Sequence, residues 1–102
     1  MFSFFGFGKS KIKNALKRGA AIIDVRTAHE YDRGKVPGSV NIPLDRISVS
    51  IERIKEIKKP VIVCCESGVR SGSAKKMLNA AGIEDVYNGG SWETVLKLRN
   101  QL

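Results

Sequence analysis

The sequence of 102 residues predicts an α/β fold, a small parallel sheet of about four to five strands with helices on both faces. Short apolar runs rich in β-branched residues, at residues 20–25, 39–42, 61–64 and 86–87, alternate with stretches that have helical apolar spacing. Glycine or proline marks most of the junctions between them. Strands that alternate with helices pair in parallel through right-handed crossovers.

The first half of the chain supplies two of these strands. Apolar residues at helical spacing predict a short helix over residues 12–18. The continuous apolar run at residues 20–25 predicts a buried strand, and residues 39–42 predict a shorter one. Between the two strands, Thr27 and Glu30 have the spacing of a capping box, which predicts a helical turn.

The second half repeats the alternation. Apolar spacing predicts helices over residues 47–54 and 74–81. Residues 61–64 lie between them and are the most β-prone run of the chain. The last short strand is followed by a predicted turn at residues 88–90, after which Ser91 caps a final helix.

Composition limits the classes of function. Lys and Arg number 18 against 10 Asp and Glu, which gives a net charge of +8. The lysine runs at residues 9–17 and 55–59 contain no interleaved aromatic residues, so we expect attraction of small anions and no nucleic-acid binding. No apolar run approaches the ~20 residues of a membrane span. We expect an N-terminal tail and short helix at residues 1–18 and one domain at residues 19–102.

The cysteines and the N-terminus bear on localisation. Cys64 and Cys65 are adjacent, so they disfavour a mutual disulfide and cannot form a four-thiolate zinc site. We expect a cytoplasmic protein with free thiols, and neither a metal nor a cofactor. The Phe-rich start at residues 1–8 has no features of a signal peptide. It is a disordered tip, a weak anchor or a packing patch for a partner.

Cys65 is the candidate nucleophile, because polar and glycine residues follow it at the end of the strongest strand. Ligands of such sheets bind at the carboxyl ends of the strands. Gly68 allows the loop to turn its N–H groups inward as an anion-binding nest. The next helix dipole and Arg70 add positive charge, so we expect the pKa of Cys65 to lie below the free value of ~8.5. Cys64, inside the strand, is expected to be a buried apolar residue.

Charged residues at the end of another strand are further candidates. Arg26 is a candidate to bind the substrate anion, although pairing with Asp24 or with loop groups is favoured. Glu30 is expected to be a capping or ion-pair residue rather than a general acid. The single histidine, His29, is expected to lie on the surface.

Three ordered segments and a closing segment resemble the signatures of the rhodanese superfamily. Residues 65–71, Cys-Glu-Ser-Gly-Val-Arg-Ser, resemble its active-site loop. Residues 23–26 and 30–43 are similar to its first and second signatures, and Gly89-Gly90 with Trp92 is similar to its closing segment. Together these matches cover about residues 20–96 and imply a rhodanese-like fold.

The resemblance implies sulfur transfer by a single-domain thiosulfate sulfurtransferase. Cys65 would attack the outer sulfur of a small anionic donor such as thiosulfate and hold it as a persulfide. Cyanide, a thiol or a protein acceptor, for example a thioredoxin-like protein, would then take the sulfur. Asp24, Glu30 and Ser71 would support the shape of the site, and Arg70 would bind the anion. The N–H groups of the loop would hold the sulfur, from Glu66, Ser67, Gly68, Val69 and Arg70.

Two alternatives stay open. Dual-specificity phosphatases of the cell cycle and arsenate reductases share the fold but have a Cys-x5-Arg loop. The chain reads Cys-x4-Arg from Cys65 to Arg70 and Cys-x5-Arg from Cys64, and the rhodanese alignment requires Cys65. The other alternative is a persulfide carrier or binding module without turnover.

Lys35 stands where the second signature often has histidine, and the short N-terminus leaves the family's extra edge strand unaccounted for. The physiological donor and acceptor and the oligomeric state are not defined by the sequence.

Overall fold

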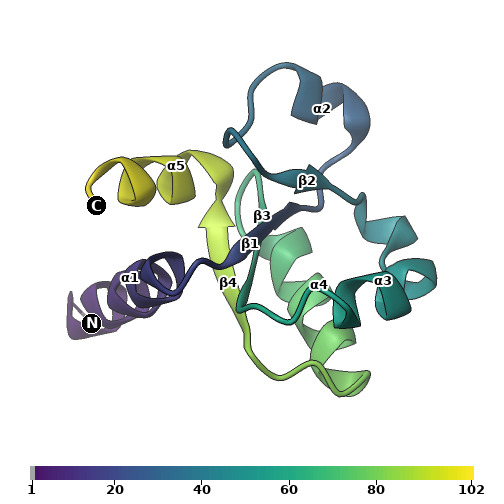
Figure 1. The fold of residues 1–102 in the computed structure, drawn as a ribbon. Helices are drawn as coiled ribbons and strands as arrows, with labels where there is room; N and C mark the ends of the chain where they lie inside the picture. The colour runs from purple at the N-terminus through teal and green to yellow at the C-terminus, as the bar shows by residue number, and fades with distance from the viewer. Residues whose placement is uncertain (1) are drawn as a thin grey trace.

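A four-stranded parallel sheet forms the centre of the molecule in a computed structural model, which describes residues 2–102 and the side chains from residue 8 onward. The strand order is β2-β1-β3-β4 and each neighbouring pair is parallel, which confirms the predicted α/β fold (Figure 1). The strands are β1 (Ala21–Asp24), β2 (Val40–Asn41), β3 (Val61–Cys65) and β4 (Val86–Ser91). The helices are α1 (Phe2–Lys17), α2 (Ala28–Asp32), α3 (Ile51–Lys55), α4 (Val69–Ala80) and α5 (Trp92–Asn100), with 3-10 turns η1 (Leu44–Arg46) and η2 (Ser48–Ser50).

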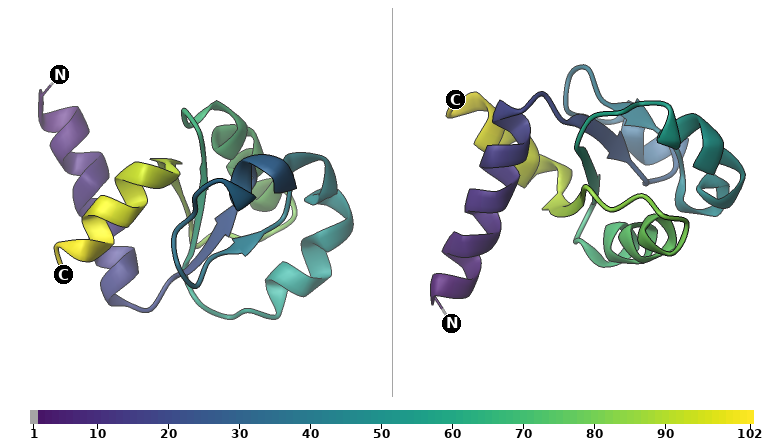
Figure 2. Two further views of the ribbon diagram at one scale, coloured as in Figure 1. Left: turned by 90° about the horizontal axis from the view of Figure 1, so that it is seen from above. Right: turned by 60° about the horizontal axis from the view of Figure 1, so that its bottom comes forward.

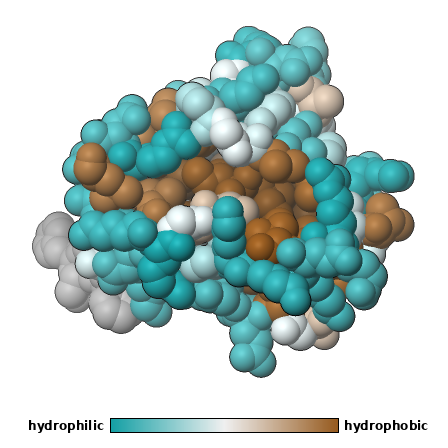
Figure 3. Space-filling view, viewed as in Figure 1, coloured by the Kyte–Doolittle hydropathy of each residue, from teal (hydrophilic) through white to brown (hydrophobic). Residues whose placement is uncertain are grey.

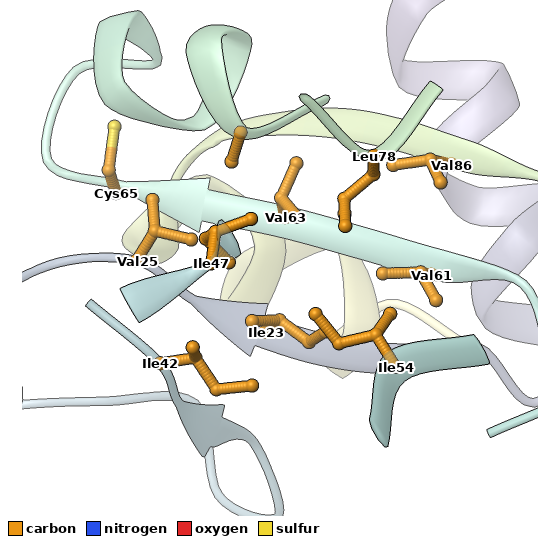
Figure 4. Packing of buried hydrophobic residues seen from close by; sticks show 11 residues of the cluster. Ile23, Val25, Ile42, Ile47, Ile54, Val61, Val63, Cys65, Leu78 and Val86 are labelled. Atoms are coloured by element: carbon orange, nitrogen blue, oxygen red, sulfur yellow. The ribbon is translucent and has the colours of Figure 1, made fainter. Parts of the chain in front are cut away.

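Each face of the sheet has its own hydrophobic core, as predicted. Successive side chains of a strand point to opposite faces, and β3 is buried along its whole length. Figure 2 shows α1 and α5 side by side, away from α3 and α4. The core under α3 and α4 includes Ile23, Val25, Ile47, Ile54, Val63, Cys65, Ala74 and Leu78 (Figure 4). The core under α1 and α5 includes Ile12, Ala15, Ile22, Ile62, Cys64, Val95 and Leu98.

The alternation of β3 separates the two adjacent cysteines. Cys64 packs in the core under α1 and α5, whereas Cys65 packs in the core under α3 and α4. In Figure 4 the Cys65 sulfur points to the side of the sheet on which α4 lies. Both thiols are free, and Cys64 is the buried apolar residue that the sequence predicts.

The predicted turn at residues 88–90 is wrong, because these residues continue β4 as far as Ser91. A shift in register between Val63 and Cys64 accommodates the extra residue. Gly89 lies where the sheet meets α5, and a Cβ there would stand 2.6 Å from Val95 Cγ2 and 2.8 Å from Ile62 Cγ2. This glycine therefore marks a close approach of α5 to the sheet rather than a turn.

The predicted helix over residues 47–54 is only partly helical. The 3-10 turns η1 and η2 precede α3, which begins at Ile51. The Ser50 hydroxyl donates to the carbonyl oxygen of Arg46 at 2.8 Å, a local hydrogen bond of the kind that competes with regular helix. Ile47 and Ile54 are nevertheless buried, so the apolar spacing identified the correct core residues.

The first helix is longer than the predicted one, since α1 begins at Phe2. Ile12 and Ala15 of this helix are buried against α5 and the sheet. The three interpretations of the Phe-rich start concern side chains that lie outside the described residues.

Across residues 2–102, no helix has both the length and the hydrophobicity needed to cross a bilayer. On the face seen in Figure 3, apolar side chains gather in a central hollow that hydrophilic side chains surround.

Candidate active site

Cys65 is the last residue of β3 and lies directly before the loop that leads into α4. Gly68 ends this loop with a φ of 101°, in the left-handed region that favours glycine. A Cβ at Gly68 would lie 3.3 Å from the Cα of Gly90, so the loop also passes close to β4. Gly68 therefore has the unusual backbone angle that the sequence predicts, and the loop turns back close to β4.

Three groups lie within hydrogen-bond distance of the Cys65 sulfur. The Gly68 N–H donates to Sγ at 3.0 Å, and the Ser71 N–H donates at 3.4 Å. The Ser71 hydroxyl also lies 3.4 Å from Sγ. Cys65 has 0% of its surface exposed, so another molecule reaches the sulfur only if neighbouring groups move. Gly68 belongs to the loop and Ser71 to the first turn of α4. Ser71, which the sequence predicts as a structural support, contacts the Cys65 sulfur directly.

The surroundings of the two cysteines act on their pKa values in opposite directions. Burial by itself raises the pKa of Cys65, but the hydrogen bonds from the Ser71 hydroxyl, from the Ser71 and Gly68 N–H groups and from Ser67 together lower it below the ordinary value. Burial, followed by the charge of Asp24, raises the pKa of Cys64 far above the ordinary value. Of the two, Cys65 is therefore the thiol that ionises more readily.

Arg70 pairs with Glu30 beside the loop. Its two terminal nitrogens donate to the two carboxylate oxygens of Glu30 at 2.7 and 2.9 Å. This bidentate pair takes up two of the roughly five N–H groups of a guanidinium. Glu30 also completes the predicted capping box with Thr27, which the structure confirms. The capping carboxylate thus holds Arg70 against α2.

Acid should release Arg70 from Glu30. The hydrogen bonds from Arg70, and then from Thr27, lower the pKa of Glu30 from 4.5 to about 2. A carboxylate whose pKa is lower in the folded state stabilises the protein at pH values above its unfolded-state pKa, here 4.5. This contribution is lost as the pH falls through the folded-state pKa of about 2. We expect Glu30→Gln to lower the free energy of unfolding in urea at about pH 6, and the difference to disappear near about pH 2.

Glu52→Gln is the matched control for that titration, because the Glu52 carboxylate is 88% exposed and lies 3.7 Å from Lys55. Its effect should stay within about 0.5 kcal/mol at every pH. A Glu30→Gln difference that remained the same size down to about pH 2 would contradict the assignment of this ion pair.

Arg26 is enclosed by acceptors. It is 2% exposed, and its Nε and one terminal nitrogen donate to the Asp24 carboxylate at 2.8–3.0 Å. The remaining N–H groups meet the carbonyl oxygens of Glu30 and Gly34 and the carboxylate of Glu66. This arrangement is the structural pairing that the sequence favours, and it leaves Arg26 without an N–H group directed at a substrate.

Trp92 and Asn88 contact the loop but were not predicted as site residues. The Trp92 indole N–H donates to Glu66 Oε1 at 3.1 Å, and its ring lies 4.9 Å from the Arg26 guanidinium carbon. Glu66 is thereby tied to Arg26 and Trp92. Asn88 contacts Gly68 and Ser71. Asn88 lies within β4, opposite Val63 of β3, and Trp92 begins α5 directly after β4. The predicted turn at residues 88–90 concealed the position of both residues beside β3.

Two other predicted features have clear positions. His29 is exposed on α2, as predicted. Lys35, which stands where the rhodanese signature often has histidine, places its ammonium 4.5 Å from the centre of the Tyr31 ring. The sheet of the described residues 2–102 has four strands.

Hollows border the loop on two sides. One of about 370 Å³ is lined by Arg70 together with Val25, Thr27 and Leu44. A wider one of about 930 Å³ follows the outer side of the loop. It is lined by Ser67, Gly68 and Val69 from the loop, by residues 88–91 of β4 and by Ile12 of α1. Cys65 is not among the residues that line either hollow.

The site consists of a cysteine at the carboxyl end of a strand in a parallel sheet, with N–H groups of the following loop and helix donating to its sulfur. Residues 9–95 match the family model of the rhodanese-like domain. The chain therefore belongs to the rhodanese-like family.

Individual proteins and a solved structure are similar to this chain. Uncharacterized protein YqhL of Bacillus subtilis is 40% identical over 73 residues, which cover 70% of this chain and little more than half, 56%, of YqhL. Thiosulfate sulfurtransferase PspE of Escherichia coli is 34% identical over 74 residues, which cover 72% of this chain and 71% of PspE. A rhodanese from Escherichia coli, solved with anions, is 33% identical with a TM-score of 0.67, and the match covers 74% of this chain and 89% of the other.

Proposed function

We propose that this protein is a sulfurtransferase that carries sulfur as a persulfide on Cys65. The observation that carries the proposal is the set of hydrogen bonds to Sγ from Gly68 and Ser71, which lowers the pKa of Cys65. A thiolate is the form of cysteine that attacks an electrophilic sulfur. The relatives named as thiosulfate sulfurtransferases support the same chemistry.

The proposed reaction has two steps. The Cys65 thiolate attacks the outer sulfur of thiosulfate, a new S–S bond forms, and sulfite leaves with the electron pair of the broken S–S bond. The persulfide then carries the negative charge. In the second step cyanide, a thiol or a protein acceptor attacks the terminal sulfur, and Cys65 returns as the thiolate.

Two sets of groups bind the anion. One is the set of Arg70 N–H groups that Glu30 does not occupy, and the other is the backbone N–H groups of residues 66–70. Free thiols suit a reducing compartment such as the cytoplasm.

Phosphatase chemistry is less well supported. It needs the longer Cys-x5-Arg loop, which in this chain begins at Cys64. Cys64 packs under α1 and α5, and its pKa is raised, so it faces away from the loop donors and stays protonated. The Cys-x4-Arg loop from Cys65 fits a single sulfur atom better.

Mass spectrometry tests the proposal. Incubation with thiosulfate should add about 32 Da, one sulfur atom, and cyanide should remove it again. Loading without release to cyanide or thiols would indicate a carrier without turnover. No adduct from either thiosulfate or a cysteine persulfide would contradict sulfur transfer in both forms.

A further inference from the structure

Asn88 contacts both of the residues that hold the Cys65 sulfur. Its Oδ1 accepts the hydroxyl of Ser71 at 2.7 Å, and its Nδ2 donates to the carbonyl oxygen of Gly68 at 3.1 Å. Gly68 and Ser71 are the residues whose N–H groups donate to Sγ. One side chain from β4 therefore joins the end of the loop to the first turn of α4.

The orientation of the Asn88 amide is fixed by a third hydrogen bond. The Gly90 N–H donates to the same Oδ1 at 2.9 Å. A flipped amide would set its NH₂ group against the Gly90 N–H and its oxygen against the Gly68 oxygen. Oδ1 therefore faces Ser71, and the single hydroxyl proton of Ser71 is donated to Asn88.

This arrangement makes Ser71 a partner for either form of the sulfur. While Cys65 is a thiol, its S–H can donate to Ser71 Oγ, whose own proton is on the bond to Asn88. When Cys65 loses its proton, the hydroxyl can rotate and donate to the sulfur anion. In the thiolate state the Ser71 hydroxyl is no longer bonded to Asn88, but the Asn88 amide still donates to the Gly68 carbonyl oxygen and keeps the Gly68 N–H directed at the sulfur.

We propose that Asn88 is a positioning residue for Cys65, which keeps the Gly68 N–H directed at the sulfur. Its importance for turnover rests on the proposed function, but its effect on the thiol does not. Asn88 is itself exposed, so its replacement removes hydrogen bonds without leaving a cavity in the core. Loss of the hydrogen bond to Gly68 should leave the Gly68 N–H less well directed, so that the thiolate becomes less stable.

The test is a pH titration of Cys65, followed by the ultraviolet absorbance of the thiolate in a Cys64→Ala background with one thiol. We expect Asn88→Ala to raise the titration midpoint by about one pH unit. Asn79→Ala is the matched control, because the Asn79 amide donates to the carbonyl of Ile83 at the other end of α4, at 2.9 Å. It should leave the midpoint unchanged.

Two further measurements keep the proposal open to refutation. Asn88→Ser, whose side chain is too short to bridge Gly68 and Ser71, should give the same shift, and it serves if Asn88→Ala does not fold. In a Ser71→Ala background the shift should be at least as large, because Asn88 then acts through Gly68 alone and no longer competes with the sulfur for the Ser71 hydroxyl proton. An unchanged midpoint in folded Asn88 variants would overturn the proposal, and a shift that disappeared in the Ser71→Ala background would overturn action through Gly68. The titration needs no sulfur donor, so it gives a result even if sulfur transfer is absent.

Discussion

Replacing Cys65 with serine should abolish the formation of thiocyanate from thiosulfate and cyanide, with kcat/KM falling by at least about a thousandfold. A hydroxyl at this position keeps the size of the side chain but has no sulfur to form the persulfide. The hydrogen bonds from Gly68 and Ser71 favour an anion at this atom, and a serine hydroxyl does not ionise near neutral pH. Steady-state kinetics with thiosulfate and cyanide measure the loss.

Cys64→Ser is the matched control for this prediction. The same chemical change one residue earlier falls in the core under α1 and α5. It should leave kcat/KM within about threefold, although a hydroxyl among apolar side chains should cost about 1–3 kcal/mol of stability. The reverse pattern, with activity lost on replacing Cys64 but kept on replacing Cys65, would overturn the assignment of the nucleophile. It would also revive the Cys-x5-Arg interpretation of the loop.

The choice between these cysteines shows what the sequence can predict. The apolar run before Cys65 and the polar residues after it were enough to place the strand end, and the two-residue period of a strand then separates the adjacent side chains. The fold class and the capping box of Thr27 and Glu30 were likewise predicted, because each depends on local spacing along the chain. These features need no knowledge of which segments meet.

The contacts that complete the site join segments far apart in sequence. Trp92 lies 26 positions from Glu66, and Asn88 lies 17 positions from Ser71. The pattern of Asn-Gly-Gly is typical of a turn, and only the packing of α5 against the sheet shows why glycine is needed at position 89. The pairing of Arg70 with Glu30 is similar, because a capping residue gave no local sign of a partner 40 positions away.

Removing the carboxylate of Asp24 should remove a large part of the free energy of unfolding of the protein. Asp24 and Arg26 are 0% and 2% exposed, and the carboxylate accepts from the guanidinium and from the Arg26 N–H. Asp24→Ala leaves the guanidinium buried with fewer acceptors, and breaking a buried pair in this way costs about 3–5 kcal/mol. Domains of this size have total stabilities of about 5–15 kcal/mol, so much of the margin disappears. The midpoint of thermal unfolding should fall by about 12 °C or more.

Two comparisons separate the loss of a buried pair from the loss of any ion pair. Asp85→Ala removes the partner of Arg18, but these side chains are 47% and 51% exposed, so the effect should stay below about 1 kcal/mol. The double variant Asp24→Ala with Arg26→Met removes both buried charges and should be more stable than Asp24→Ala alone. A double variant as unstable as the sum of the two single variants would show that the pair is not coupled. In that case Arg26 would owe its place to the carbonyl oxygens of Glu30 and Gly34 and to Glu66, rather than to Asp24.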